Sequence, residues 1–280
     1  MIGSDTLSLT RFFQSLTASG DKILLDLSSI FSQSENINIA EKGHSQKYLH
    51  LYHINLALVF SGRRHKPVIH EILPRSVWDY KAFQSIMERY DLRECIIIAD
   101  RGIASYHVPK KKGIYLIVAV RRNSSIVDFN MKLDRRFIFR NMGINAGMKG
   151  LCVEIIYMYE DTSLRSEEEI NLIKKMEAGE ISAKYLMEGK RKFGKFAILS
   201  NIRAEMKEIY EPYKSREEVE QVFDAMKNEL ESGKSYPRSN EKVKGFFFIV
   251  FLALRIRFKI LKVLKDHNLL GKMSVNEIIF

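Results

Sequence analysis

Cysteine is scarce in this chain of 280 residues, which contains only Cys95 and Cys152. A structural zinc site needs four ligands that are rich in cysteine and histidine, so two cysteines cannot build the usual cysteine-rich site. Both lie within apolar runs, "ECIIIAD" and "LCVEIIY". This placement predicts two buried free thiols in a reducing compartment.

We predict neither a secretory leader nor a membrane span from the sequence. Its start, "MIGSDTLSLTRFFQSL", has no continuous apolar core behind a basic segment, so we expect no signal peptide. The apolar run in "GFFFIVFLALRIRFKILKVL" stops at Arg255, after about half of the roughly 20 residues that a span requires. Cations then alternate with Ile and Leu. We expect a buried helix that becomes amphipathic, with no membrane partner; a basic helix lying on a membrane or on DNA is the alternative.

Positive charge is in excess. The chain has 45 Lys and Arg against 34 Asp and Glu, a formal net charge of +11. This excess favours a polyanionic partner, of which nucleic acid is the commonest. The hydrophobic content of 46% is enough for a sizeable folded core.

Apolar runs in the first 120 residues follow the order strand, strand, strand, helix, strand, strand. The predicted strands are 21–30, 48–60, 66–74, 94–100 and 113–120, and the predicted helix is 79–91. This is the order of a ribonuclease H-like core, an α/β fold with a mixed sheet and flanking helices. Two further helices, at 213–230 and about 241–268, complete the core.

Residues 121–192 interrupt this pattern with strands and a polar helix of their own. The sequences that predict them are "RRFIFRNMG", "LCVEIIYMYED" and "SEEEINLIKKMEAGE". We therefore expect a β-rich insertion. The predicted organisation is an N-terminal remnant (1–20), a catalytic core (21–120 and 193–268), the insertion (121–192) and a C-terminal tail (269–280).

The segment "YKSREEVEQVFDAMKNEL" (213–230) is amphipathic, and Ser215 with Glu218 fits a capping box at its start. At about 100° per residue, Arg216, Glu220 and Lys227 lie within roughly 40° of one another beside the apolar stripe. Such a group is commonly a salt-bridged surface cluster. It is equally compatible with a metal-ligating acid beside cations that bind phosphate.

Two further acids, Asp26 and Asp100, each end an apolar run, and we interpret both as acids at strand ends. The first and fourth strands of a ribonuclease H-like sheet are neighbours, so these acids would lie side by side, and a C-terminal helix could bring Glu220 to them. Three close carboxylates repel one another unless a cation binds, and Mg²⁺ prefers oxygen ligands. An acid at a strand end is also a common turn former, which is the structural alternative for each acid taken singly.

The segments "IIIADRGIAS" and "FAILSNIRAEMKEIYEPYKSREEVEQVFDAMKN" resemble the DDE transposases of bacterial and archaeal insertion sequences, specifically the insertion-sequence-four-like group. The signature of that group is Tyr, two residues, Arg, three residues, Glu, six residues, Lys. Tyr213, Arg216, Glu220 and Lys227 match it at every position. The resemblance covers roughly residues 20–265, and members of the family also carry a β-rich insertion before the Glu.

The resemblance implies that Asp26, Asp100 and Glu220 are the catalytic acids and hold Mg²⁺ or Mn²⁺, with two ions as the expectation. Arg216 and Lys227 would bind DNA phosphates, and Tyr213 would contact the cut strand. The implied activity is DNA cleavage followed by strand transfer. The implied partners are double-stranded DNA (transposon ends and target) and a second copy of the chain on that DNA. The implied location is the cytoplasm of a prokaryote, on the nucleoid when DNA is bound.

Three features depart from the family pattern. Asp26 follows only 25 residues, so we expect the N-terminal domain that recognises transposon ends to be missing. Arg75 stands where the family tends to have Gly, and Ile103 where an aromatic residue is usual. Two alternatives therefore stay open: a nuclease or resolvase on the same fold, and a truncated, non-catalytic DNA-binding remnant.

Overall fold

The computed structural model describes residues 5–32, 37–42, 52–77, 79–90, 92, 94–100, 113–229, 234–235, 237, 239–269 and 272–279. The chain forms two compact units. The first contains Met1–Ile97, Pro109–Ile114 and Ser215–Phe280, and the second contains Ile98–Val108 and Tyr115–Lys214. The predicted insertion, residues 121–192, is shorter than the second unit, and the predicted domain boundaries stay predictions.

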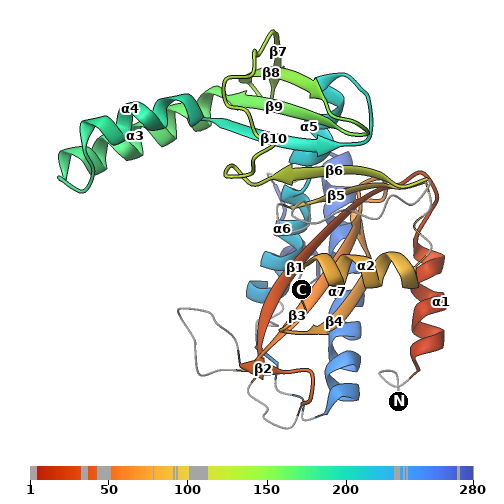
Figure 1. Cartoon of the computed structure of the whole chain (residues 1–280). Coiled ribbons are helices and arrows are strands. Elements are labelled where there is room, and N and C mark those ends of the chain that lie inside the picture. Colours follow the sequence, from red (N-terminus) through yellow and green to blue (C-terminus); the bar gives the residue numbers. More distant parts are fainter. Residues whose placement is uncertain are drawn as a thin grey trace. The chain divides into compact units, whose positions relative to one another are not determined.

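The first unit is built on a mixed sheet (Figure 1). Its strands are β1 (Lys22–Ser32), β2 (Glu41–Lys42), β3 (Tyr52–Ser61), β4 (Lys66–Pro74), the start of β5 (Ile96–Ala99) and β11 (Lys234–Ser235). The order is β4-β3-β1-β5, with β2 also beside β3 and β11 beside β1. β3 runs antiparallel to β1 and β4, whereas β11 is parallel to β1. The predicted α/β class and the neighbouring first and fourth core strands are confirmed.

Helices lie on both faces of this sheet, with α2 on one face and α7 on the other (Figure 1). They are α1 (Thr6–Leu16), α2 (Asp79–Arg89), α6 (Glu217–Asp224) with a π-helical turn (Ala225–Glu229), α7 (Asn240–Asp266) and α8 (Val275–Ile279). The helix predicted at about 241–268 is thus confirmed as α7. Across the described residues, no helix combines the length and the apolar character that a membrane crossing needs.

The second unit is an antiparallel sheet in the order β6-β10-β9-β8-β7. Its strands are β6 (Tyr115–Val120), β7 (Arg135–Phe139), β8 (Met142–Gly150), β9 (Ile155–Asp161) and β10 (Lys195–Ser200). Its helices are α3 (Thr162–Glu177), α4 (Ala183–Gly189) with the 3-10 turn η2 (Lys190–Lys192), and α5 (Met206–Lys214). The strands and the polar helix expected between residues 121 and 192 are present, and β8 is an addition that its three glycines concealed.

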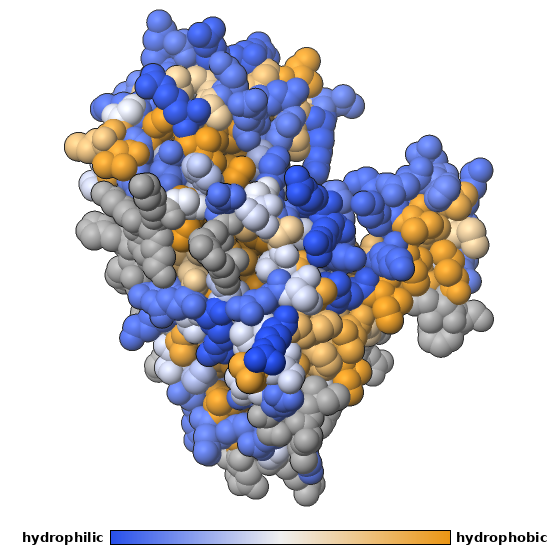
Figure 2. Space-filling view, turned by 90° about the vertical axis from the view of Figure 1, so that its right-hand side faces the viewer, coloured by the Kyte–Doolittle hydropathy of each residue, from blue (hydrophilic) through white to orange (hydrophobic). Residues whose placement is uncertain are grey.

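Two local predictions were wrong. α6 begins at Glu217 with Arg216 at its N-cap position, and residues 213 and 214 belong to the preceding helix, so Ser215 is not the N-cap of one long helix. Cys95 is buried as predicted, but Cys152 is exposed because it lies in the loop between β8 and β9. Figure 2 shows hydrophilic residues over most of the visible surface, with hydrophobic patches between them.

A close contact with the backbone of another segment requires glycine at position 147 of β8. The loop before β7 crosses this position, and a Cβ atom added to Gly147 would lie 2.2 Å from the carbonyl oxygen of Lys132. Gly150 on the same strand has nothing within 4 Å of such an atom. The two glycines therefore provide a matched comparison.

We predict that Gly147→Ala lowers the free energy of unfolding by about 1–3 kcal/mol, because backbone must move to admit the methyl group. Gly150→Ala should change it by less than about 0.5 kcal/mol. Urea denaturation of both variants measures the difference. Equal stabilities would contradict the close approach of the loop to β8.

His70 of β4 is buried among aromatic rings. Its ring centroid lies 5.2 Å from that of Phe13 and 5.1 Å from that of Phe251. Neither ring nitrogen has a hydrogen-bond partner among the described residues. Burial alone lowers the pKa of His70 from 6.5 to about 3, so the imidazole is neutral in the folded protein at ordinary pH.

This shift predicts an acid-sensitive fold. The unfolded chain protonates His70 as the pH falls below 6.5, whereas the folded chain resists protonation down to about 3, so stability is lost across this window. At pH 5 the loss is about 2 kcal/mol relative to pH 7.5. We expect His70→Leu to remove that part of the pH dependence. Urea midpoints of both proteins at the two pH values measure it, and identical pH dependences would contradict the assignment.

Candidate catalytic site

Asp26 lies in the middle of β1, opposite Leu58 of β3. The prediction that it ends a strand is wrong, because β1 continues in register with β3 as far as Ser32. Its side chain is half-buried. One carboxylate oxygen, Oδ1, accepts a hydrogen bond of 3.0 Å from the backbone N–H of Leu27. Pairing with β3 from Ile23 to Ser32 holds the backbone at Asp26 in place.

Glu220 lies on α6, which packs against β1 within the first unit. Val219, Val222 and Phe223 form the buried face of this helix, whereas Glu220 is exposed. The helical period that buries these three side chains leaves Glu220 outside the apolar stripe. Asp26 and Glu220 thus belong to two elements that contact each other.

Asp100 is the residue that directly follows β5, and its side chain is half-buried. β5 neighbours β1 in the strand order, as expected from the sequence. Asp100 itself belongs to the second unit. Ile103, where the sequence departs from the family pattern, lies outside the described residues.

The Tyr-Arg-Glu-Lys signature is divided between the two units. Tyr213 lies on α5 in the second unit, with its ring centroid 5.9 Å from that of Phe196. Arg216 and Lys227 belong to the first unit, at the N-cap of α6 and in the π-helical turn after it. The ammonium nitrogen of Lys227 lies 5.9 Å from the ring centroid of Phe223.

Among the described residues, no group of three or more His, Cys, Asp or Glu side chains is arranged to hold a metal ion. The donor chemistry of the predicted acids nevertheless fits a hard divalent cation, because Asp26 and Glu220 offer carboxylate oxygens on contacting elements. Asp26, Asp100 and Glu220 therefore remain predicted ligands.

Arg75 is accommodated in the turn that follows β4. Its guanidinium donates a hydrogen bond of 3.3 Å to the side-chain oxygen of Asn55, which is buried on β3. The side-chain amide of Asn55 donates in return to the carbonyl oxygens of Arg75 and Val77, each at 3.3 Å. The bulky cation is thus part of a hydrogen-bonded turn.

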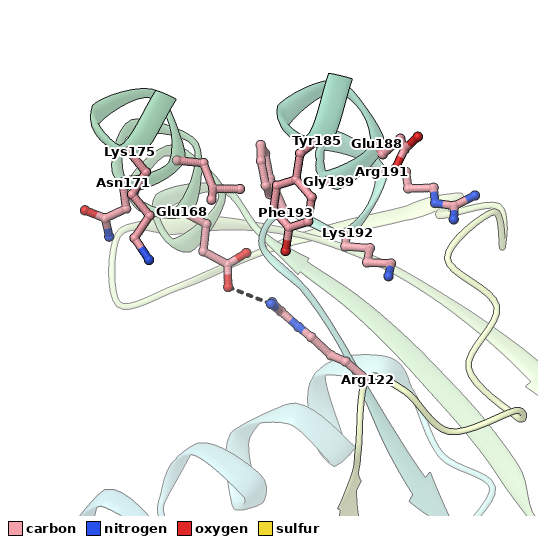
Figure 3. Close-up of a pocket in the computed structure, with 11 residues that line it drawn as sticks. Arg122, Glu168, Asn171, Lys175, Tyr185, Glu188, Gly189, Arg191, Lys192 and Phe193 are labelled. Atoms are coloured by element: carbon pink, nitrogen blue, oxygen red, sulfur yellow. Dashed lines mark ion pairs between the residues drawn. The ribbon is translucent and has the colours of Figure 1, made fainter. Parts of the chain in front are cut away.

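A pocket of about 440 Å³ lies in the second unit, where α3, α4 and η2 meet the end of β6 (Figure 3). It contains none of the predicted catalytic residues. Arg122 reaches into it and donates to Glu168 at 2.8 Å, and its Nε donates to the carbonyl oxygen of Lys195 at 2.8 Å. Because both contacts hold Arg122 in place, this side chain ties α3 to the sheet.

Sequence reasoning did not find a buried polar group on β4. Glu71 is buried and forms a hydrogen-bonded ion pair with Arg89 of α2. Burial raises the pKa of Glu71, and the nearby Arg89 and Lys244 oppose that rise. These residues and His70 line a second pocket, of about 230 Å³. The only signal in the sequence was a His-Glu pair inside an apolar strand, "KPVIHEILP".

Comparison with known proteins gives three results. The sequence model of the family described as "Transposase DDE domain" matches residues 28–256, a range that includes Asp100 and the Tyr-Arg-Glu-Lys signature and begins two residues after Asp26. No curated protein is similar in sequence. Among solved structures, a piggyBac transposase synaptic complex with hairpin DNA aligns with a TM-score of 0.47 and 9% identity, over 88% of this chain and 54% of that chain.

Proposed function

Because the chain belongs to the transposase DDE domain family, we propose that it cleaves DNA strands and joins them to new positions. The observation that carries this proposal is the family match over residues 28–256, which contains the acid after β5 and the complete Tyr-Arg-Glu-Lys signature. The contact between β1 and α6 supports it, because these elements carry Asp26 and Glu220.

In this proposal Asp26, Asp100 and Glu220 bind two Mg²⁺ or Mn²⁺ ions. When bound, the ions supply an activated oxygen nucleophile and stabilise the charge of the leaving oxygen. The three carboxylates would hold the ions, since without a cation they would repel an anionic phosphodiester. In cleavage, the oxygen of a water molecule bonds to phosphorus while the bond from phosphorus to the 3′-oxygen breaks. Water gives up a proton, and the leaving 3′-oxygen takes one up to become the 3′-hydroxyl. In strand transfer, a 3′-hydroxyl replaces water as the nucleophile.

Arg216 and Lys227 bind the phosphates beside the cut, and Tyr213 contacts the cut strand. Double-stranded DNA is the partner, which the net charge of +11 favours. Two copies of the chain would hold the two transposon ends together. A nuclease or resolvase would share the cleavage step and lack strand transfer onto a second duplex.

We predict that Asp26→Asn, Asp100→Asn and Glu220→Gln each reduce Mg²⁺-dependent cleavage by roughly 10³-fold or more. In a catalytic group that acts as a unit, the loss of one member costs about as much activity as the loss of all. DNA binding should persist. Cleavage of a labelled duplex, and transfer of a pre-cut 3′ end, measure both steps. Asp224→Asn, which removes an exposed acid on the same helix, is the matched control and should cleave normally.

Each outcome is informative. A variant of any of the three acids that cleaves at the normal rate would remove that acid from the site. Loss of DNA binding together with cleavage would mean that the acids are structural. Cleavage without strand transfer by the unaltered chain would favour a nuclease, and binding without cleavage would favour a non-catalytic remnant.

Lys227→Ala should weaken DNA binding and reduce the slope of log K against log salt concentration by about 1, because one phosphate contact is lost. Lys242→Ala on α7, which also removes an exposed cation, should leave the slope within about 0.3 of the unaltered value. Fluorescence anisotropy at salt concentrations from about 50 to 200 mM measures this slope for each protein. An unchanged slope for Lys227→Ala would exclude it from the phosphate contacts.

A further inference from the structure

The two strands β7 and β8, together with the residues just before them, form a basic ribbon that we define as residues 132–150. It carries five cations and one acid, Asp134, for a net charge of +4. The cations are Lys132, Arg135, Arg136, Arg140 and Lys149, and all five are exposed. The whole chain has an excess of +11, so these 19 residues hold more than a third of it.

The ribbon lies at the end of its sheet. β7 pairs with β8 on one side and is the last strand in the order. A two-residue turn joins the strands, because Phe139 pairs with Met142. Arg140 and Asn141 in this turn both have positive φ, 45° and 64°, as a type I′ turn requires. Arginine is an uncommon choice at such a position, where Asn, Asp or Gly costs less.

The packing of β7 decides which side chains face outward. The rings of Phe137 and Phe139 lie 5.3 and 5.2 Å from that of Tyr210 on α5, which fixes one face of the strand. Arg136 and Ile138 alternate with these rings and therefore point to the opposite face. Ile138 is 70% exposed there. The guanidinium of Arg140, in the turn, lies 5.0 Å from the centroid of the Phe139 ring.

The partner strand leaves space for one of these arginines. A Cβ atom added to Gly143 of β8 would lie 3.1 Å from a terminal guanidinium nitrogen of Arg136, so the guanidinium lies across a position without a side chain. Within the described part of the chain, neither Arg135 nor Arg136 forms an ion pair with an acid. Both charges remain available to an external anion.

We propose that the β7–β8 ribbon binds the phosphate backbone of double-stranded DNA, with Arg135, Arg136 and Arg140 as the principal contacts. This inference rests on the proposed function for its partner and adds a surface that contains none of the residues of the Tyr-Arg-Glu-Lys signature. Arginine suits phosphate because its planar fork donates two hydrogen bonds. A two-stranded ribbon also has the width that the major groove admits.

A competing explanation is that the cations protect an open sheet edge, since charged side chains prevent edge-to-edge pairing. The two explanations differ in their dependence on the sign of the charge. An acid would protect the edge as well as an arginine does, but it would repel phosphate.

The test is the triple substitution Arg135→Glu, Arg136→Glu and Arg140→Glu, with Arg→Lys at the same positions as the conservative variant. We expect the Glu variant to stay folded and unaggregated by circular dichroism and gel filtration. Its salt slope for binding a DNA duplex in EDTA should fall by about 2–3, since each phosphate contact contributes about 0.9. The Lys variant should keep most of the slope.

Lys174→Glu, Lys175→Glu and Lys184→Glu on α3 and α4 make the same change in net charge at exposed positions of the second unit. A slope that falls equally in this control would assign the effect to net charge, and a Glu ribbon variant that binds normally would also overturn the proposal. Binding in EDTA needs no catalysis. If the Glu ribbon variant binds DNA normally while the unaltered chain cleaves DNA, this inference alone is refuted. If the Glu ribbon variant binds DNA with the reduced slope but the unaltered chain does not cleave, only the catalytic proposal is refuted.

Discussion

The long antiparallel pairing of β1 with β3 is the constraint on which the first unit depends. It runs without interruption from Ile23 opposite Ser61 to Ser32 opposite Tyr52. Side chains alternate between the two faces of a sheet, so a slip of one residue would move Asp26 to the other face. The same strand is the surface against which α6 packs, and that contact places Glu220. The register of one pair of strands therefore decides whether two of the three proposed catalytic acids can cooperate.

In the second unit, two tyrosine hydroxyls position the helix α5 against the sheet. The hydroxyl of Tyr157 donates to the carbonyl oxygen of Ile202 at 2.9 Å, and that of Tyr159 donates to that of Met206 at 2.8 Å. Both bonds hold the start of α5 on the sheet. Burial raises the pKa of Tyr159, which keeps its hydroxyl a neutral donor. The position of α5 in turn places Tyr213 beside Phe196 and Tyr210 beside the basic ribbon.

The acids of this protein separate into two groups by environment. Asp21, Glu71 and Glu160 are buried and have partners: Asp21 accepts from Ser61 and from the backbone of Arg63, Glu71 pairs with Arg89, and Glu160 pairs with Arg165. These carboxylates stabilise the two units, because a buried charge without partners would be costly. Asp26 and Asp100 are half-buried and Glu220 is exposed, so these three remain accessible to solvent and ions.

The sequence by itself determined the elements of the core and the spacing of the signature, because strand and helix periods are local properties of the chain. Apolar runs predicted β1, β3, β4, β5, β6 and α7, and four side chains within 15 residues identified the family. Only the tertiary structure revealed the Gly-rich β8, the break between α5 and α6 at Ser215, the exposed Cys152 and the basic ribbon. Each of these depends on contacts between distant residues, such as Phe137 with Tyr210 or Gly147 with Lys132, which no local pattern contains.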